Sequence, residues 1–423
     1  MEFEGAVPLH LRRLLHLRSS AAPPHESGAK GEQHQNRLRP HARFPGHTYR
    51  KPDPGPDLKY SFKIELADGT TIIANMTDKP YKSGSVKIAP HAFIKKTAHF
   101  RREKMKKYKS FLTRHEGNPI FAPEDFPFCK ADQVFNPGQV MTPDGRTILL
   151  LSVVPRTGGG ARCHVAESTD GVNFTIREKP LFSTENSAFP EFDGHPIDCR
   201  VTYFPEEDCY YIIRPGNGRD VGPVALLYRT KDFITAEPIE IVSLPTNRVP
   251  CLFPEKINGQ YVRLDRPYNC ATATYAASMA HIWLSRSPDL IHWGEHRLVL
   301  RRGVVPWGSD KLGPTPPIKT EKGWLEIFHG VQNCFSSWRY SIGAALLDLE
   351  NPEKVIGVMK SYLLTPEAEY EFHGVVPDTV FTTGAVVDWK SRTLRIYYGA
   401  ADTSIGLAQG NIDEIVDGCL NGI

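Results

Sequence analysis

The sequence predicts an all-β fold, a five-bladed β-propeller preceded by an N-terminal extension. The first observation is an internal repeat, because short strand-like segments separated by turns recur five times after Gly117. The second is the spacing of the repeats, 56 to 63 residues, which is slightly longer than a usual propeller blade. The third is the lack of helical periodicity between the strands, which excludes a parallel α/β fold. One such array can occupy most of a chain of 423 residues.

Each repeat contains three classes of segment. One class begins at a turn and runs into a β-rich stretch, as in "DGRTILLLSVV", "EDCYYIIRP", "NGQYVRLDRP", "KGWLEIFHG" and "SRTLRIYYGA". A second class follows the first, as in "ALLYRTKDF" and "IWLSRSPDLIHW". A third class precedes it and supplies the inner strand of each blade. The predicted starts of these inner strands are Asn136, Asp198, Pro254, Thr315 and Asp378.

The chain divides by composition into three parts. Residues 1–56 are rich in Pro, Gly, His, Arg and Ser, and we expect them to be disordered because they cannot bury enough apolar surface. Residues 57–116 form an extension, in which "KYSFKIELADGTTIIANM" predicts a hairpin around an Asp-Gly turn and residues 93–115 a basic helix. Residues 117–423 are the propeller. The extension could cover a neighbouring subunit of a homo-oligomer.

The charge balance argues against a nucleic-acid or membrane partner. Lys and Arg number 51 and Asp and Glu 48, which leaves a net charge of only +3. The basic helix is interpreted as having a solvated face rather than a nucleic-acid patch, because no base-stacking motif accompanies it. No apolar run is long enough to span a membrane. We therefore expect small-molecule partners.

The eight cysteines indicate reduced thiols. They are scattered, with no C-x-x-C pair and no spacing typical of metal ligands. This pattern predicts a cytoplasmic protein without a metal site.

The repeat gathers polar residues at one mouth of the channel. The first strand of each propeller blade lines the central channel, so equivalent strand starts converge in space. Reading those starts, and the ends of the second strands, gives one acid, several cations and a histidine, which is a candidate site for a polyanion and a sugar. These residues are Asn136, Asp198, Arg200, Arg248, Lys311, Asp378, Arg214, Arg266 and His329.

The same segments carry a family resemblance. "FNPGQV", "IDCRVTYFPEEDCYYI", "CLFPEKINGQYVRLDRP", "KLGPTPPIKTEKGWLEIFHGV", "YSIGAALLDLENPEKVIG" and "LRIYYGAADTSIGLA" together resemble glycoside hydrolase family 130. This is a family of β-mannoside phosphorylases, with some β-mannosidases, built on a five-bladed propeller. The match runs from about Asn118 to Ala408.

The resemblance implies roles for individual residues. It implies that Asp198 is the catalytic acid, with Cys199 where the family has a proline. The implied phosphate ligands are Arg248, Arg266, Lys311 and His329, and Asn136 and Tyr340 match residues near the phosphate and the −1 sugar. The chain departs from the family at Val375 to Asp378, "VVPD" where Asp-Val-Pro-Asn is common, and at Asp265, where the family has His. These departures bear on the −1 contacts and the sugar specificity. The predicted substrate-binding residues are Asn136, Arg200, Tyr340 and Asp378.

The predicted function is inverting phosphorolysis of β-mannosides to α-mannose 1-phosphate, with inorganic phosphate as co-substrate and no cofactor. A phosphorylase needs only an acid and a cationic cluster, because phosphate arrives already anionic. Two alternatives stay open. One is β-mannoside hydrolysis, which needs a second carboxylate, for which Glu255 is the candidate. The other is a non-catalytic propeller that binds glycans.

Two assignments at the opening of the second blade also have alternatives. Arg200 either orients Asp198 or fixes the end of the strand. His195 is either a sugar ligand or a structural turn residue before Pro196.

Overall fold

A computed structural model of the chain describes residues 4–6, 61–65, 71–75, 77, 79–83, 86–90, 92–96, 110–182, 187–218, 221–268, 280–334 and 337–422. The chain divides into two compact units, residues 1–108 and residues 109–423. No helix within these described stretches is both long and apolar enough to cross a membrane.

The first unit contains two small antiparallel sheets. The larger has the strand order β1-β6-β3-β2, and the smaller pairs β4 with β5. The bounds are β1 Glu4–Ala6, β2 Ser61–Glu65, β3 Thr71–Asn75, β4 Tyr81–Ser83, β5 Val86–Ile88 and β6 Ala92–Lys96. Pairing of Ser61 with Asn75 and of Glu65 with Thr71 confirms the predicted hairpin.

The prediction of a helix over residues 93–115 is wrong for its first residues, which belong to strand β6. Phe93 and Ile94 pair with Ala74 and Ile73 of β3, because aromatic and β-branched residues fit a pleated strand that already has a partner. Residues 97–109 lie outside the described part of the chain. So does most of the predicted disordered tail, residues 1–56, of which Glu4–Ala6 forms β1.

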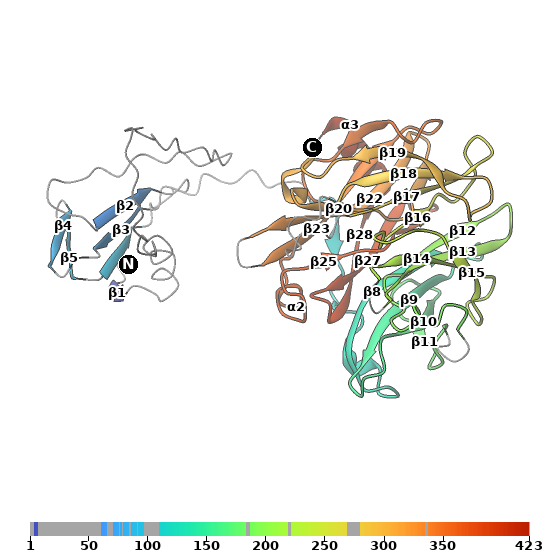
Figure 1. Ribbon diagram of the computed structural model, residues 1–423, viewed down its shortest axis with the longest axis horizontal. Coiled ribbons are helices and arrows are strands. Elements are labelled where there is room, and N and C mark those ends of the chain that lie inside the picture. Colours follow the sequence, from blue (N-terminus) through green and yellow to red (C-terminus); the bar gives the residue numbers. More distant parts are fainter. Residues whose placement is uncertain are drawn as a thin grey trace, which may run out of the picture. The chain divides into compact units, whose positions relative to one another are not determined.

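The second unit contains the five sheets of the predicted propeller (Figure 1). Blade 1 has the order β11-β10-β9-β8, blade 2 β12-β13-β14-β15 and blade 3 β16-β17-β18-β19. Their bounds are β8 Ala131–Met141, β9 Thr147–Pro155, β10 Arg162–Ser168, β11 Thr175–Ile176, β12 Arg200–Phe204, β13 Cys209–Gly216, β14 Val224–Thr230, β15 Glu237–Ile241, β16 Cys251–Leu252, β17 Tyr261–Asp265, β18 Ile282–Ser287 and β19 Gly294–Leu300.

Blades 4 and 5 each carry an extra short strand beside the second one. Blade 4 has the order β20-β22-β23-β24 with β21 on β22, and blade 5 the order β25-β27-β28-β7 with β26 on β27. Their bounds are β20 Lys311–Gly313, β21 Ile318–Thr320, β22 Gly323–Asn333, β23 Trp338–Leu347, β24 Val355–Val358, β25 Val380–Phe381, β26 Val386–Asp388, β27 Thr393–Ala400, β28 Ser404–Asn411 and β7 Thr113–Arg114. Short 3₁₀ turns lie at Pro123–Asp125 and Pro306–Gly308, and helix α2 at Glu369–Phe372.

The apolar core lies between the blades. Because side chains alternate along a strand, a blade packed on both faces needs apolar residues at every position, as in "TILLLSVV". Ile148 and Leu150 pack against blade 2, whereas Leu149 and Leu151 pack against blade 5. Equivalent clusters join blades 2 and 3, 3 and 4, and 4 and 5.

The last strand of blade 5 comes from the N-terminal side of the propeller. Thr113 and Arg114 of β7 pair with Gln409 and Ala408 of β28. The Arg114 guanidinium also binds the fully buried Glu371, with Nε 2.8 Å from Oε1 and Nη2 2.9 Å from Oε2. The ring is thus closed by residues from both ends of this unit.

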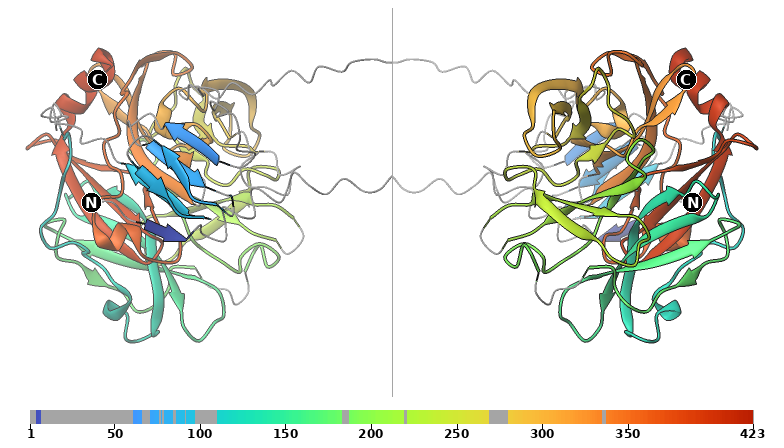
Figure 2. Two further views of the ribbon diagram at one scale, coloured as in Figure 1. Left: turned by 90° about the vertical axis from the view of Figure 1, so that its left-hand side faces the viewer. Right: turned by 90° about the vertical axis from the view of Figure 1, so that its right-hand side faces the viewer.

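Helix α3, Ile412–Asn421, completes the fold near the C-terminus (Figure 2). The Asn411 side chain accepts hydrogen bonds from the amides of Asp413 and Glu414, which makes it the N-cap, and Gly422 ends the helix at a φ of 63°. The apolar face of α3 packs into the cluster between blades 4 and 5.

Three inner strands begin earlier than predicted. Blade 1 begins at Ala131 rather than Asn136, blade 3 at Cys251 rather than Pro254, and blade 4 at Lys311 rather than Thr315. Proline lacks an amide donor, so the prolines around Thr315 interrupt the ladder between β20 and β21. Thr315 instead donates its amide to Glu326 Oε1 (2.9 Å) and its hydroxyl to the Ile327 carbonyl (2.6 Å).

Candidate active site

Three residues at equivalent repeat positions share an unusual backbone conformation. Asn136, Asp198 and Asp378 have positive φ angles of 43°, 54° and 60°. Asn136 lies at an irregularity within β8, whereas Asp198 and Asp378 come just before β12 and β25. Asn and Asp tolerate this left-handed region better than other residues that carry a Cβ, so the residue types suit the conformation.

Asp198 is held by contacts from blade 1 and from the segment ahead of blade 3. Asn136 Nδ2 of blade 1 donates to Asp198 Oδ1 at 2.8 Å, and Arg248 Nη2, ahead of blade 3, lies 3.3 Å from Oδ2. The Asp198 amide donates to Ser152 Oγ at 3.1 Å. The carboxyl is only 2% exposed, so its place at the channel is fixed.

Arg200 binds the backbone of Asp198 rather than its carboxylate. Its Nη1 donates to the Asp198 carbonyl at 2.5 Å. Burial lowers the pKa of Arg200 to about 10. Within the described residues, its Nε and Nη2 have no hydrogen-bond partner. The contact favours the interpretation that Arg200 fixes the end of the strand.

Four basic residues come together beside Asp198. Arg266 Nη1 lies 3.1 Å from His329 Nε2, and Lys311 Nζ lies 2.6 Å from the Tyr340 hydroxyl. Burial and the charges of Arg266 and Arg248 hold the pKa of Lys311 well below its ordinary value. The predicted phosphate ligands from blades 3 and 4 are therefore one electrostatic cluster.

His329 is a neutral member of this cluster. It is fully buried, and burial together with Arg266, Arg200, Lys311 and Arg248 holds its pKa well below the ordinary value. Since guanidinium can only donate, Nε2 accepts from Arg266 and the ring proton lies on Nδ1. In the described structure Nδ1 has no hydrogen-bond partner, so it is an available buried donor.

Two of the predicted substrate-binding residues, Tyr340 and Asp378, contact each other through their backbones. The Tyr340 amide donates to the Asp378 carbonyl at 3.1 Å. The Asp378 carboxylate pairs with Arg339, whose Nε lies 3.0 Å from both of its oxygens. Asp378 thus contacts the segment that carries Tyr340.

Asp402 is a site residue that the sequence reasoning missed. It follows β27 in blade 5 with a φ of 49°, and burial and the charge of Asp198 raise its pKa to about 7, against the opposing effects of Arg248 and Lys311. The polar ends of the second strands in blades 2, 3 and 4 are Arg214, Arg266 and His329. The equivalent stretch in blade 5, "GAADT", contains Asp402 and is the sequence signal for it.

Arg214 and Glu255 lie in other surroundings. Arg214 is fully buried, pairs with Asp193 and packs on the ring of Phe182 at 4.8 Å. Glu255 pairs with Lys319 Nζ of β21 at 2.6 Å. Both contacts join one segment of the propeller to another, and sequence spacing alone could not reveal the partners.

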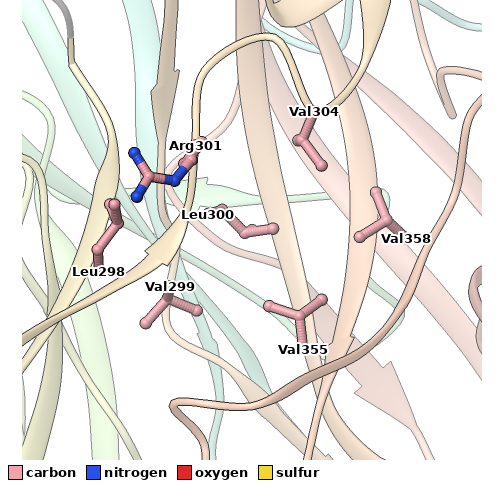
Figure 3. Close-up of a pocket in the computed structure, with 7 residues that line it drawn as sticks. All are labelled: Leu298, Val299, Leu300, Arg301, Val304, Val355 and Val358. Atoms are coloured by element: carbon pink, nitrogen blue, oxygen red, sulfur yellow. The ribbon is translucent and has the colours of Figure 1, made fainter.

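An apolar groove lies at the outer edge of the propeller, between β19 and β24 (Figure 3). Its volume is about 300 Å³. It is lined by Leu298, Val299, Leu300, Arg301, Val304, Val355 and Val358. It presents one cation and no carboxylate, so it lacks the acid that the channel site has.

Comparison with known proteins points to the same chemistry. Residues 104–421 match the model of a family described as beta-1,4-mannooligosaccharide phosphorylase. A protein of that name from Ruminococcus albus is 32% identical over 73% of this chain and 91% of its own length. A beta-1,2-mannobiose phosphorylase from Listeria innocua is 38% identical over 60% of this chain and 67% of its own.

The fold matches solved structures as well. The beta-1,2-mannobiose phosphorylase from Listeria innocua, solved as its β-1,2-mannobiose complex, superposes with a TM-score of 0.62 and 30% identity. The superposition covers 73% of this chain and 99% of that one.

Proposed function

Since the chain belongs to glycoside hydrolase family 130, we propose that it catalyses inverting phosphorolysis of β-mannosides, which yields α-mannose 1-phosphate. The observation that carries this proposal is the cluster of cations beside the acid Asp198. Arg248, Arg266 and Lys311 act on one another and on His329, next to Asp198. Holding these charges together in a buried site costs free energy, which a phosphate anion would offset.

The geometry supports a division of labour between the blades. Asp198 comes from blade 2 and gives its proton to the glycosidic oxygen as the bond from that oxygen to the anomeric carbon breaks. Arg266, Lys311 and His329 come from blades 3 and 4 and hold phosphate, whose oxygen forms the new bond to that carbon. Arginine offers paired donors to phosphate oxygens and lysine a point charge. The neutral His329 adds a donor without further charge repulsion.

Both carboxylate oxygens of Asp198 contact donors in the free protein, Asn136 and Arg248. Proton delivery therefore requires the substrate to rearrange one of these contacts. The resemblance to the family suggests a route in which a mannosyl hydroxyl relays the proton. Asn136, which contacts Asp198, and Tyr340, which contacts Lys311, are the proposed contacts to the −1 sugar.

Hydrolysis on the same scaffold is a second candidate function, and Asp402 is the observation that favours it. An inverting hydrolase needs two carboxylates, one as acid and one as base. Asp198 and Asp402 act on each other electrostatically. The cation cluster has no use in such a reaction, which is why phosphorolysis is preferred.

The deciding experiment is product analysis with and without phosphate. The protein is incubated with β-1,2-mannobiose, β-1,4-mannobiose and β-1,4-mannosylglucose, and products are followed by ³¹P and ¹H NMR. Phosphorolysis gives α-mannose 1-phosphate only when phosphate is present. Free mannose formed at the same rate without phosphate would establish hydrolysis instead, and no turnover of any mannoside would leave glycan binding.

The proposed partners are a carbohydrate and inorganic phosphate, with phosphate as co-substrate and no further cofactor. Among the described residues, no group of three or more His, Cys, Asp or Glu side chains is arranged to hold a metal ion. We also propose a cytoplasmic location. Its support is that seven described cysteines are free thiols.

A further inference from the structure

The segment that leads into Asp198 is fastened to the propeller at Asp193. This buried carboxylate pairs with Arg214, accepts a hydrogen bond from the Tyr228 hydroxyl at 2.9 Å and another from Ser187. Arg214 Nη2 also donates to the Tyr228 hydroxyl at 2.8 Å. A buried network of ion pairs and hydrogen bonds of this kind holds a loop in one conformation. The backbone that carries His195, two positions after Asp193, is therefore held in a fixed position.

His195 docks on the glycine-rich turn between β9 and β10. Its Nδ1 accepts a hydrogen bond from the Ala161 amide at 3.0 Å. Gly160 has a φ of +82°, and a Cβ there would lie 2.2 Å from the Gly194 carbonyl oxygen. Only glycine allows the two turns to approach so closely. The contact fixes the orientation of the imidazole.

The same contact fixes the tautomer of His195. Because Nδ1 accepts from an amide, the single proton of the neutral ring lies on Nε2. Burial and the charge of Arg248 lower the pKa of His195, although Asp198 opposes them, so the ring is neutral at pH 7. Nε2–H is thus a fixed, uncharged donor within the electrostatic reach of Asp198 and Arg248.

The placement of His195 matches the side of the leaving group. The phosphate-binding cations come mostly from blades 3 and 4, whereas Asp198 and His195 lie between blades 1 and 2. In an inverting displacement the nucleophile and the leaving group lie on opposite faces of the sugar ring. A donor beside the acid is therefore placed for the sugar that leaves.

We propose that His195 Nε2–H donates a hydrogen bond to a hydroxyl of the acceptor sugar, which makes His195 a specificity-determining residue. The inference rests on the proposed phosphorolysis. It assigns to blades 1 and 2 the recognition of the sugar that Asp198 releases. In the reverse reaction the same contact selects the sugar that receives mannose.

Two variants of His195 separate this role from loop anchoring. His195→Asn keeps an acceptor near the position of Nδ1, so it preserves the bond from Ala161 and removes the outer donor. His195→Gln keeps a donor near the position of Nε2 and loses the acceptor. Each is assayed in the synthetic direction, with α-mannose 1-phosphate and mannose or glucose, and in the phosphorolytic direction for the phosphate KM.

The expected result for His195→Asn is a rise in the acceptor KM on the order of tenfold, the effect of one lost hydrogen bond, with the phosphate KM unchanged. His195→Gln should retain more acceptor affinity than His195→Asn. Monodeoxy acceptors identify the hydroxyl, because its deletion weakens binding in the wild type and has no further effect in His195→Asn.

Three results would overturn the inference. A wild-type acceptor KM in His195→Asn with a defect in His195→Gln means that the ring only anchors the turn. A changed phosphate KM in His195→Asn places the residue in the phosphate site, and unchanged kinetics in both variants removes any role. Failure of the proposed function is recognised separately, because the wild type would then form no sugar phosphate.

Discussion

Arg339 Nε lies 3.0 Å from both carboxylate oxygens of Asp378, and the same aspartate accepts the Tyr340 amide through its carbonyl. Tyr340 in turn lies 2.6 Å from Lys311 Nζ. An ion pair near the rim is thereby connected to the cation cluster through one tyrosine.

This relationship predicts non-additive effects of mutation. Asp378→Asn and Arg339→Ala should each lower kcat/KM a few-fold, because either loosens the strand that carries Tyr340. The double variant should be no worse than the more severe single variant. The stability coupling should be small, about 0.5 kcal/mol, since Arg339 is half exposed and solvent screens the pair. A double-mutant cycle in kcat/KM measures this, and purely additive losses would contradict it.

Asp198→Asn tests the proposed acid. We expect kcat to fall about 10³-fold, the typical contribution of general acid catalysis, while the melting temperature stays close to that of the wild type. Asp208→Asn is a matched control, because Asp208 also has a positive φ (46°) but lies at the opposite end of β12. Retained activity in Asp198→Asn, or equal losses in both variants, would refute the assignment.

Lys311→Met should separate stability from function. Removing a buried cation from a repelling cluster should raise the free energy of unfolding by about 1 kcal/mol without phosphate, and phosphorolysis should be lost. The pKa of Lys311 is lowered in the folded state, so the unfolded chain binds more protons between that value and 10.5. The stability of the wild type should therefore rise with pH through this window relative to Lys311→Met. Urea titrations at several pH values measure the difference.

The raised pKa of Asp402 predicts where activity falls on the alkaline side of the pH–rate profile. This pKa of about 7 reflects burial and the charge of Asp198, so Asp402 carries a proton below that pH and is ionised above it. The ionised form adds a negative charge beside the cations that would hold phosphate, so kcat/KM should fall as the pH rises through about 7. Asp402→Asn should shift this limb, and an unchanged limb would show that Asp402 does not control it.

Arg114→Ala should destabilise the closure of the propeller. It leaves the buried Glu371 without its guanidinium partner, which typically costs about 3 to 5 kcal/mol. Burial raises the pKa of Glu371, but the bonds from Arg114 and two amides outweigh it and hold the pKa below its ordinary value. This contribution to stability is therefore present at neutral pH and lost as the pH falls through the folded pKa. Glu371→Gln in the Arg114→Ala background should recover part of the loss in chemical denaturation, and a further loss would argue against an uncompensated charge.

The fold was predictable because its repeat lies in the residues themselves. Strands packed on both faces must be apolar at successive positions, and Asn136, Asp198 and Asp378 recur at positions with a positive φ. The closing strand was not predictable, since β7 has two residues and its partner lies almost 300 residues away. The inner strands β16 and β20 start earlier than predicted, at Cys251 and Lys311, because the prolines that follow these residues gave no sign that the strands had already ended.

The site was predictable to the extent that propeller symmetry brings equivalent positions together. That rule placed Lys311, Arg266 and His329 in one cluster with Asp198. The same rule also grouped Arg214 with these residues, but Arg214 pairs with Asp193, a contact that only the three-dimensional structure reveals. The pairing of Asp378 with Arg339 likewise depends on two adjacent blades and leaves no trace in spacing.

The ring of blades has a consequence for synthesis of the protein. Ala408 must reach Arg114 before blade 5 is complete, and Ala408 is made almost 300 residues after Arg114. During translation the earlier blades can form only an open arc, in which the apolar side of blade 1 that packs against blade 5 stays uncovered. The nascent chain is most in need of protection from aggregation in this interval, which ends when β28 has emerged.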